Sequence, residues 1–299
     1  MTNIVLDKVL SGLITRYKER VPDVSAIINA MIKEGVINND GGIENDHIAF
    51  RTICVPFLGI QSLEKIFLHY GFEKKDHYYF PAKKLDAYWY APPSAEYPRI
   101  FISELRVQDL SEDAQNIIHS YTDEITYDPV LKVNLDNAGE VDQFLHSGLW
   151  RIPTLEGYLT LSKESEYVAW VIYNRYYLNH FTISVHNLKE GYNTIADFNI
   201  FLERNGFTLN DSGSKIKVSP DGNLLQSATV AEMIEATFAN GVKHRISGSY
   251  VEFAERKVLK QFEHLPSSAI KPEHRREGFE ANNADKIFES TYSAQTSKK

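Results

Sequence analysis

The sequence predicts an α+β fold in which two paired βαβββ modules form one cupped mixed sheet, with N-terminal and inserted helices. Two observations lead to this prediction. An order of strand, helix and three strands occurs twice along the 299 residues, and such repetition indicates two copies of one supersecondary unit. In addition, matching strands of the two copies carry histidine and glutamate, which are residue types that bind metal ions. The sheet is therefore expected to surround a metal site.

The composition is that of an ordinary globular protein. Hydrophobic residues make up 43% and charged residues 24% of the chain, which is long enough to bury a sizeable core. With a formal net charge of −8 and no basic stretch interleaved with aromatics, a nucleic-acid partner is not expected. The sequence has no run of about 18 apolar residues, the length that a membrane span needs. Because Cys54 is the single cysteine and the N-terminus lacks a signal-peptide pattern, the cytoplasm is the expected compartment.

Residues 1–40 are predicted to form a helical cap. Apolar residues at helical spacing indicate one helix before the Val-Pro-Asp break at 21–23 and a second helix after it. Residues 41–107 form the first module, in which the β-like run HIAFRTICV is followed by the helix-like SLEKIFLHYG and three short β-like runs, HYYFP, DAYWYAP and RIFISEL. The helix pair could cover the sheet or form a dimer contact, and periodicity favours neither role.

Residues 108–165 are predicted to be a mainly helical insertion, and residues 166–260 the second module. In this module NHFTISVHNL corresponds to DHIAFRTICV, ADFNIFLERNGF to LEKIFLHYGF, and SYVEFAER to RIFISELR. Each helix ends in Gly-Phe, at Gly71 and Gly206, and glycine is a common helix C-cap. The second module is longer, and its extra residues are expected in the loop DSGSKIKVSPDGNL. A C-terminal segment, 261–299, completes a single domain.

Three residues of the two modules form a candidate metal site. The first strand of each module carries a histidine, His47 and His180, and the last strand of the second module carries Glu252. Two imidazoles and one carboxylate are the ligand set of non-haem Fe(II) oxygenases, because they leave positions open for substrate and oxygen. Each histidine alone would more often be an ordinary hydrogen-bonded residue, and Glu252 could belong to a solvated strand face. The prediction therefore depends on the matched positions.

Two further residues are candidates for a role beside the metal. The repeat aligns Glu104 with Glu252, so Glu104 could be a fourth ligand, an acceptor that orients a histidine or a structural residue, and a role other than ligand is favoured. Arg51 lies four residues after His47 and therefore on the same face of the strand. Its guanidinium can hold a substrate carboxylate with two hydrogen bonds, unless Asp46 or Glu104 engages it in a salt bridge.

Several stretches of the chain are similar to those of a known family. NDHIAFRT, LNHFTISVHNL, GNLLQSATVAE, SYVEFAER and REGFEANNADKIFESTY together resemble the 2-oxoadipate dioxygenase/decarboxylase family, also called hydroxyglutarate synthases, of the vicinal-oxygen-chelate superfamily. The resemblance extends from about residue 40 to residue 292. It implies an Fe(II) enzyme that converts 2-oxoadipate and O2 into 2-hydroxyglutarate and CO2, a step of lysine catabolism.

The resemblance also implies roles for individual residues. His47, His180 and Glu252 would bind the metal ion, and Arg51 would bind the substrate and position it for catalysis, with the two histidines beside it. The partners would be a small 2-oxo acid and O2. Two other functions stay open: a glyoxalase-like isomerase or lyase in which Glu104 moves a proton, and a small-ligand binding protein without catalysis. The sequence indicates neither the oligomeric state nor which 2-oxo acid is used.

Overall fold

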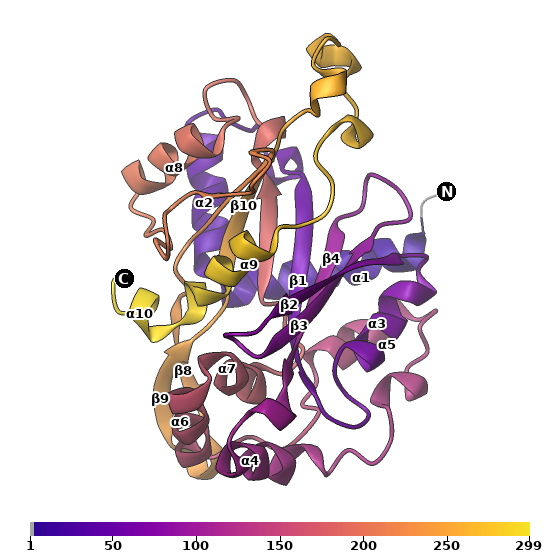
Figure 1. Cartoon of the computed structure of the whole chain (residues 1–299), viewed down its shortest axis with the longest axis vertical. Helices are drawn as coiled ribbons and strands as arrows, with labels where there is room; N and C mark the ends of the chain where they lie inside the picture. Colours follow the sequence, from indigo (N-terminus) through magenta and orange to yellow (C-terminus); the bar gives the residue numbers. More distant parts are fainter. Residues whose placement is uncertain (1–2) are drawn as a thin grey trace.

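The computed structural model describes residues 3–299 and contains one large curved sheet with helices on both faces (Figure 1). Its eight strands are β1 (Asn45–Cys54), β2 (Glu73–Phe80), β3 (Leu85–Ala91), β4 (Arg99–Arg106), β5 (His180–Ser184), β6 (Lys217–Val218), β7 (Leu224–Ala228) and β10 (Tyr250–Arg256). Their order in the sheet is β2-β3-β4-β1-β5-β10-β7-β6. The predicted α+β fold is confirmed, because the four strands of each module are neighbours in one mixed sheet.

The two modules meet where β1 lies beside β5. These strands are antiparallel, with His47 opposite Thr182 and Ala49 opposite His180. Each histidine is thus opposite the residue that lies two positions after the other histidine. An approximate two-fold axis between the strands therefore relates His47 to His180. On the outer side of each strand the next neighbour is parallel, β4 beside β1 and β10 beside β5. The register of the sheet therefore relates the two modules residue by residue.

The helices α3 (Ile60–His69) and α8 (Ile195–Arg204) follow the first strand of their modules. Each helix is followed by a glycine, Gly71 or Gly206, with a φ of +87°. Glycine has no Cβ and adopts this left-handed conformation at little steric cost, so the chain can turn back toward the sheet. The predicted helix ends at the two Gly-Phe pairs are confirmed.

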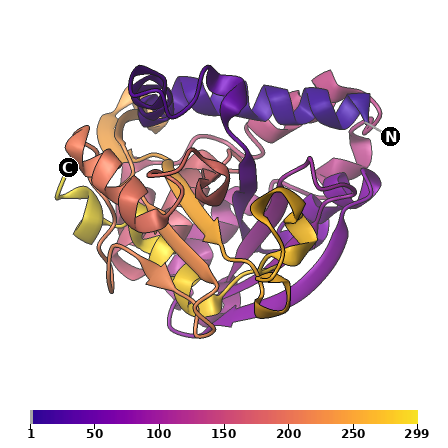
Figure 2. The same ribbon diagram turned by 90° about the horizontal axis from the view of Figure 1, so that it is seen from above.

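The N-terminal helices α1 (Ile4–Arg20) and α2 (Pro22–Lys33) lie along one side of the sheet (Figure 2). The side chain of Asn3 caps α1 by accepting hydrogen bonds from two backbone N–H groups of the first turn. From α1, the Tyr17 hydroxyl donates a hydrogen bond to the backbone carbonyl of Tyr250 in β10. Of the two roles that the sequence allowed for this helix pair, these contacts support coverage of the sheet.

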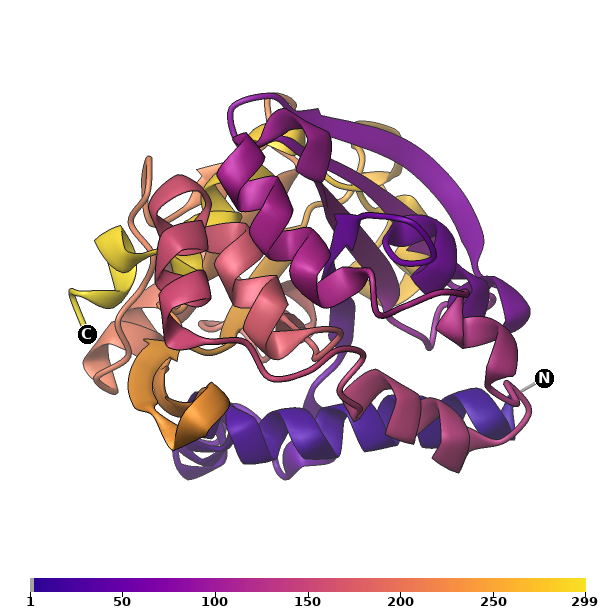
Figure 3. The ribbon, with the colours of Figure 1, turned by 90° about the horizontal axis from the view of Figure 1, so that it is seen from below.

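Helices also fill the chain between β4 and β5. They are α4 (Glu112–Thr122), α5 (Ala138–His146), α6 (Leu155–Glu164) and α7 (Glu166–Asn174). In the view from below in Figure 3, α4, α6 and α7 lie in front of the sheet, with α6 packed beside α7, whereas α5 packs against α1. Since α7 also contacts β1, α7 lies directly against a central strand. No helix of the described residues combines the length and the apolar character that crossing a bilayer would require.

The extra residues of the second module lie elsewhere than expected. They form a separate two-stranded ribbon, β8 (Met233–Thr237) with β9 (Lys243–Ser247), between β7 and β10, so the prediction of a longer loop before β7 was wrong. The ribbon is short and is joined by a turn at Ala239–Gly241. Short alternating runs of this kind give a weak strand signal, whereas the Gly-rich and Pro-containing loop gives a strong turn signal.

The C-terminal segment covers the open side of the cupped sheet. The helix α9 (Ala281–Ile287) crosses it in Figure 1 and contacts β2 as well as β6. Because β2 and β6 are the outermost strands of the sheet, α9 connects two edges that curvature brings toward each other. The 3₁₀ turn η9 (Phe288–Thr291) and the short helix α10 (Ser293–Thr296) follow it. The concave face of the sheet is thus enclosed by the last part of the described chain.

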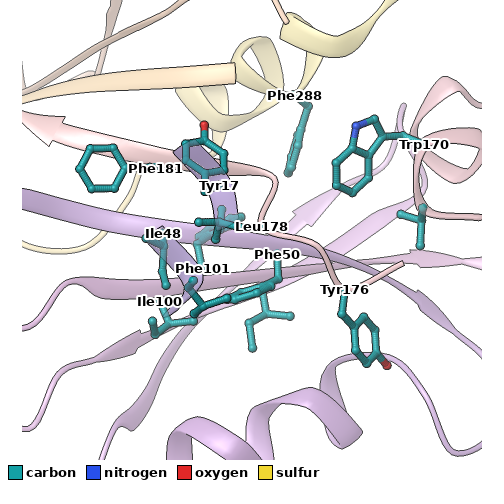
Figure 4. Close-up of a cluster of buried hydrophobic side chains, with 14 of the residues drawn as sticks. Tyr17, Ile48, Phe50, Ile100, Phe101, Trp170, Tyr176, Leu178, Phe181 and Phe288 are labelled. Carbon is teal, nitrogen blue, oxygen red and sulfur yellow. The ribbon is translucent and has the colours of Figure 1, made fainter. Parts of the chain in front are cut away.

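Both faces of the central strands are buried. In β1 the alternation of a strand points Ile48 and Phe50 toward the flanking helices and His47 and Arg51 toward the concave face. Figure 4 shows the apolar side chains of this region, which come from both modules and from α1, α7 and η9. Burial of each large apolar side chain contributes about 1.5–3 kcal/mol. The strands that carry the polar residues of the concave face are therefore held in place by tight apolar packing.

Candidate metal centre

Three of the predicted site residues converge on the concave face of the sheet. His47 is on β1, His180 on β5 and Glu252 on β10, and all three side chains are buried. The two Nε2 atoms lie 3.3 Å apart, and Nε2 of His180 lies 3.1 Å from a Glu252 oxygen. One candidate ligand atom from each residue lies within 4.8 Å of the others. The three side chains thus offer two nitrogens and a carboxylate to one point.

The outer ring nitrogen of each histidine has its own acceptor. Nδ1 of His47 lies 2.8 Å from an Asp46 oxygen, and Nδ1 of His180 lies 3.1 Å from the Asn179 side-chain oxygen. These contacts assign the N–H to Nδ1 in each ring, which leaves the Nε2 lone pairs directed into the site. Metal-binding histidines commonly donate their second N–H to such an acceptor. Sequence reasoning missed both acceptors, although each directly precedes its histidine.

The carboxylate of Glu252 is also oriented by neighbours. The side-chain amide of Gln226 in β7 donates a 2.6 Å hydrogen bond to Glu252 Oε1. Gln226 is itself fixed, because its side-chain oxygen accepts a hydrogen bond from Asn283 in α9 at 3.0 Å. This chain of contacts joins the helix that covers the site to the carboxylate. Gln226 lies in GNLLQSATVAE and Asn283 in REGFEANNADKIFESTY, but no local pattern in the sequence distinguishes them from their neighbours.

The electrostatics of the site favour a cation. Burial opposes the charged form of His47, but the carboxylates of Glu252 and Asp46 outweigh it and raise the pKa of His47. Burial, together with nearby His47 and Arg51, lowers the pKa of His180 well below its ordinary value, so this ring is neutral. A metal ion would occupy the position between the Nε2 lone pairs and the carboxylate. The donor set therefore suits a divalent metal ion of the kind that imidazole and carboxylate bind.

Asp46 belongs to a second layer of buried charges. Burial alone would raise the pKa of Asp46, yet the guanidinium groups of Arg256 and Arg99 hold it well below its ordinary value. Arg256 binds Asp46 with two hydrogen bonds, of 2.6 and 2.9 Å. The ionised carboxylate can therefore accept from His47 and from Arg256 at the same time. This pair also settles one open alternative, since Asp46 is not the partner of Arg51.

Arg51 is buried on the same concave face and has no acidic partner among residues 3–299. Its side chain is 1% exposed. The two terminal nitrogens donate to the Thr291 hydroxyl at 2.8 Å and to the Phe288 carbonyl at 2.9 Å, while Nε has no partner. The rings of Tyr167 and Trp170 lie 5.0 and 5.3 Å from the guanidinium carbon. A buried, unpaired charge of this kind is costly unless a ligand neutralises it.

Glu104 lies away from the metal ligands, and its alignment with Glu252 was wrong. Arg99 pairs with His47 in the way that Tyr250 pairs with His180, so Phe101, two residues after Arg99, is equivalent to Glu252. Three residues further on, the Glu104 side chain points to the opposite face of the sheet. There it accepts a 2.8 Å hydrogen bond from the backbone N–H at the start of α3. This position agrees with the prediction that Glu104 is not a metal ligand.

A small pocket adjoins the three candidate ligands. Its walls are mainly apolar, and they come from the sheet and from the C-terminal segment: Phe101, Phe279, Ala284, Ile287 and Phe288. Phe279 packs edge-on against His47, with 4.7 Å between ring centroids. Sequence reasoning missed this C-terminal contribution. The quoted motif REGFEANNADKIFESTY contained the residues, but helical periodicity does not indicate which strand a terminal segment covers.

Curated plant proteins are similar to this chain over nearly its whole length. The chain is 42% identical over 97% of its residues to "2-oxoadipate dioxygenase/decarboxylase, chloroplastic" of Arabidopsis thaliana, of which it covers 78%. The chloroplastic/amyloplastic protein of the same name from Oryza sativa subsp. japonica is also 42% identical, with 80% of it covered. Because these relatives are named as plastid proteins, the expected cytoplasmic location is corrected. An ordinary composition and a single cysteine are equally compatible with an organelle interior.

The family follows from sequence and structure together. The hydroxyglutarate synthase of Oryza sativa, solved in complex with 2-oxoadipate, superimposes with a TM-score of 0.86 at 41% identity, covering 97% of this chain and 92% of that one. The family model described as 2-oxoadipate dioxygenase/decarboxylase matches residues 9–269. This match includes His47, His180 and Glu252, the residues that the sheet brings together. The chain therefore belongs to the 2-oxoadipate dioxygenase/decarboxylase family.

Proposed function

We propose that this chain binds Fe(II) through His47, His180 and Glu252 and converts 2-oxoadipate and O2 into 2-hydroxyglutarate and CO2. The observation that supports it best is the combination of an open three-ligand site with a buried arginine that has no acidic partner. The metal ion held by the three ligands would bind the 2-oxo end of the substrate, and Arg51 would bind the carboxylate at its other end. The reaction is balanced, since the six carbons of the substrate become five carbons of product and one CO2.

Fe(II), when bound, would supply the electrons that activate O2 and open positions at which a 2-oxo acid can chelate. Asp46 and Asn179 would hold the two imidazoles in the tautomer that presents Nε2. Gln226 would keep the Glu252 carboxylate turned toward the site. These residues act by positioning, which is the contribution that a protein makes when the bound group performs the difficult chemistry.

Arg51 would bind the carboxylate at the far end of the substrate. It lies four residues from His47 along β1, a rise of roughly 13 Å at about 3.3 Å per residue, and both side chains reach into the same face. A dicarboxylate can bridge this interval only when its two ends are separated by several carbon atoms. This geometry supports a substrate of the length of 2-oxoadipate and fixes which end faces the metal ligands.

The apolar cover would exclude water from the reaction. Phe279, Ile287 and Phe288 lie over the ligands, and the buried side chains leave little room for solvent. A dry site strengthens the interaction of Arg51 with a carboxylate and prevents side reactions of a reactive intermediate with water. Because α9 supplies part of this cover, we expect it to shift when substrate enters.

The two other functions that the sequence left open receive less support. An isomerase or lyase with Glu104 as the proton carrier would need that carboxylate in the pocket, whereas Glu104 binds the start of α3 on the other face. A non-catalytic binding protein would have no need for three buried ligands whose orientations are each fixed by a neighbour. Both alternatives differ from the proposed reaction in one measurable respect, which is the consumption of oxygen.

Oxygen uptake tests the proposal. The protein is purified without oxygen, reconstituted with Fe(II) and mixed with 2-oxoadipate or 2-oxoglutarate in an oxygen electrode, while CO2 and 2-hydroxyglutarate are measured. We expect uptake with 2-oxoadipate, one CO2 per O2, and a much slower reaction with the shorter acid. Zn(II)-loaded protein serves as the control, because Zn(II) suits the same ligands but has no redox chemistry. A metal-replete protein that consumes no oxygen with either acid would refute the proposed reaction.

A further inference from the structure

The pocket beside the three candidate ligands is too small for the proposed substrate. Its volume is about 20 Å³, whereas a single water molecule already needs roughly 10–15 Å³. A dicarboxylate with six carbon atoms therefore enters only when one wall of the pocket moves. The side from which the acid arrives decides which wall this is.

A much larger cavity, the outer cavity, opens at the end of the sheet where β1 and β4 begin. Its volume is about 680 Å³, within the range of about 300–1,000 Å³ that is usual for small-molecule sites. Its walls include Asp46 and Arg99 from the sheet and residues of the segment 267–277, which stands out at the top of Figure 1. In this segment, Arg275 donates a 2.8 Å hydrogen bond to the backbone carbonyl of Arg256 and forms no ion pair with any of residues 3–299. The outer cavity thus offers an incoming dicarboxylate both space and a cation.

The ring of Phe279 separates the outer cavity from the small pocket. On the pocket side, its centroid lies 4.7 Å from that of His47 and 4.9 Å from that of Phe101, and both residues line the pocket. On the other side, the ring centroid lies 6.0 Å from that of Trp89 and 5.5 Å from the guanidinium carbon of Arg256, and both of these residues line the outer cavity. Since Phe279 is itself buried, its ring fills the space between the two.

Phe279 is the wall that moves at the lowest cost. It lies in the irregular segment before α9, directly after Gly278, whose φ is +73°. A path beside the ring would separate Asp46 from Arg256, and breaking a buried ion pair costs about 3–5 kcal/mol. A path through α9 would break the hydrogen bonds that Asn283 donates to β7. Rotation of the Phe279 side chain breaks packing contacts but no hydrogen bond.

We infer that the 2-oxo acid enters from the outer cavity and that Phe279 is the gate of this passage. The inference rests on the proposed function, because it assumes a dicarboxylate that lies between the three ligands and Arg51. The outer cavity, His47 and Arg51 follow one another along β1. An acid that enters with its far carboxylate first therefore reaches Arg51 and leaves its 2-oxo end at the ligands. The ring of Phe279 then returns and closes the site over the bound acid.

The Phe279→Ala variant tests the gate, because it removes the ring and keeps the backbone. Binding of 2-oxoadipate to protein fully loaded with Fe(II) is followed by stopped flow without oxygen, from the visible absorbance of the chelate that a 2-oxo acid forms with Fe(II). Minor states of proteins are commonly about 0.1–10% populated, so loss of the gate should raise the association rate constant roughly 10-fold or more. A side chain that only packs against the acid would alter the dissociation rate constant alone. An unchanged association rate constant would therefore overturn the inference.

A bulky label in the outer cavity tests the route in protein that keeps Phe279. The exposed Cys54 is first replaced by serine. Ser267→Cys then places one thiol in the wall of the outer cavity, and this thiol is coupled to a bulky maleimide. Ser120→Cys, at an exposed position of α4 outside that wall, carries the same label as the matched control. We expect the label to lower the association rate constant severalfold in the Ser267→Cys protein and to leave it unchanged in the control. Equal rate constants in the two labelled proteins would refute the route.

Oxygen uptake by the same proteins separates this inference from the proposed function. Binding of 2-oxoadipate without oxygen consumption would refute the proposed reaction, whereas the association rate constants would still test the passage. Absence of binding would refute both. Oxygen consumption together with unchanged association rate constants in all variants would support the reaction and overturn the role of Phe279.

Discussion

The two halves of the sheet share one frame but present different chemistry on their concave faces. The frame is shared at Glu104 and Glu255, which occupy equivalent register positions and each accept a 2.8 Å hydrogen bond from the first backbone N–H of the helix in their own module. It is shared again at Gly71 and Gly206, which have the same φ. These features hold a helix against a sheet, and they serve both modules in the same way.

The halves differ where side chains meet the pocket. The register equates Phe101 with Glu252 and Arg51 with Ser184. One module therefore supplies an apolar wall and a cation, whereas the other supplies the carboxylate of the candidate metal site. A symmetric pair of modules would give a symmetric four-ligand site. In the proposed function, this asymmetry would leave one side of the candidate metal site free for substrate and would orient the substrate from the three ligands toward Arg51.

The largest effect is expected at Glu252, one of the two glutamates that sequence similarity had aligned. Glu252→Gln replaces a negative ligand with a neutral amide. Since loss of a neighbour that merely orients a ligand costs roughly 10- to 100-fold in metal affinity, loss of the ligand itself should exceed this range. The anaerobic Fe(II) dissociation constant, measured by competition with a chromophoric chelator, checks it, together with oxygen uptake.

Glu104→Gln is the control for this change, because it alters the same chemical group in the other module. Its amide oxygen can still accept from the start of α3, so Fe(II) affinity should change by no more than about twofold. If Glu104→Gln abolished metal binding while Glu252→Gln did not, the equivalence of Phe101 with Glu252 would be wrong.

The second effect concerns the cation that only one module supplies. Arg51→Lys keeps the charge but loses the forked geometry that binds a carboxylate with two hydrogen bonds. We expect kcat/KM for 2-oxoadipate to fall roughly 30- to 150-fold, by analogy with a lost charged hydrogen bond of about 2–3 kcal/mol, with Fe(II) affinity unchanged. Arg106→Lys, in a strand of the same module but ion-paired with Asp86 and Asp109, should leave both values unchanged. Turnover unaffected by Arg51→Lys would make Arg51 structural.

The sequence predicted those parts of the site that the repeat places at matched positions. His47 and His180 were selected because each lies on the first strand of its module, and Arg51 because alternation in a strand is regular. The register of the strands could not be predicted from the sequence, since it depends on which residues pair across neighbouring strands and not on sequence similarity between the modules. Glu104 was therefore aligned with Glu252, although the two face opposite sides of the sheet.

The remaining differences have similar physical causes. The ribbon β8–β9 was missed because two short alternating runs carry less signal than the turn-rich loop before β7. The role of α9 was missed because the pairing of a terminal segment with distant strands depends on tertiary packing. By contrast, Asp46 and Asn179 could have been found, since each directly precedes a candidate ligand at matched repeat positions and each offers a side-chain oxygen.

The third effect is a difference in stability between variants of Asp46 and Asn179, the two residues that accept a hydrogen bond from a candidate histidine ligand. Asp46→Asn leaves the buried Arg256 without its anion, and breaking a buried pair costs about 3–5 kcal/mol. Asn179→Ala removes only the acceptor of His180, so the free energy of unfolding should fall by about 1–2 kcal/mol while Fe(II) affinity falls roughly 10-fold or more. Urea unfolding of the metal-free proteins and anaerobic Fe(II) titration measure the two quantities. Equal stability losses would show that the Asp46–Arg256 pair contributes no more to stability than the hydrogen bond between His180 and Asn179.

The smallest effect tests the shared frame at the ends of α3 and α8. A φ of +87° at Gly71 and Gly206 is unfavourable for alanine, and left-handed backbone costs an L-residue about 1–2 kcal/mol. An added Cβ would meet no atom within 4 Å at Gly206 and only Pro93, at 3.5 Å, at Gly71, so backbone strain should dominate at both sites. We therefore expect Gly71→Ala and Gly206→Ala to lower the free energy of unfolding in urea by similar amounts and to leave Fe(II) affinity unchanged. A loss confined to one glycine would mean that the two modules are not equivalent at this turn, because the same strain would then be relieved in one of them.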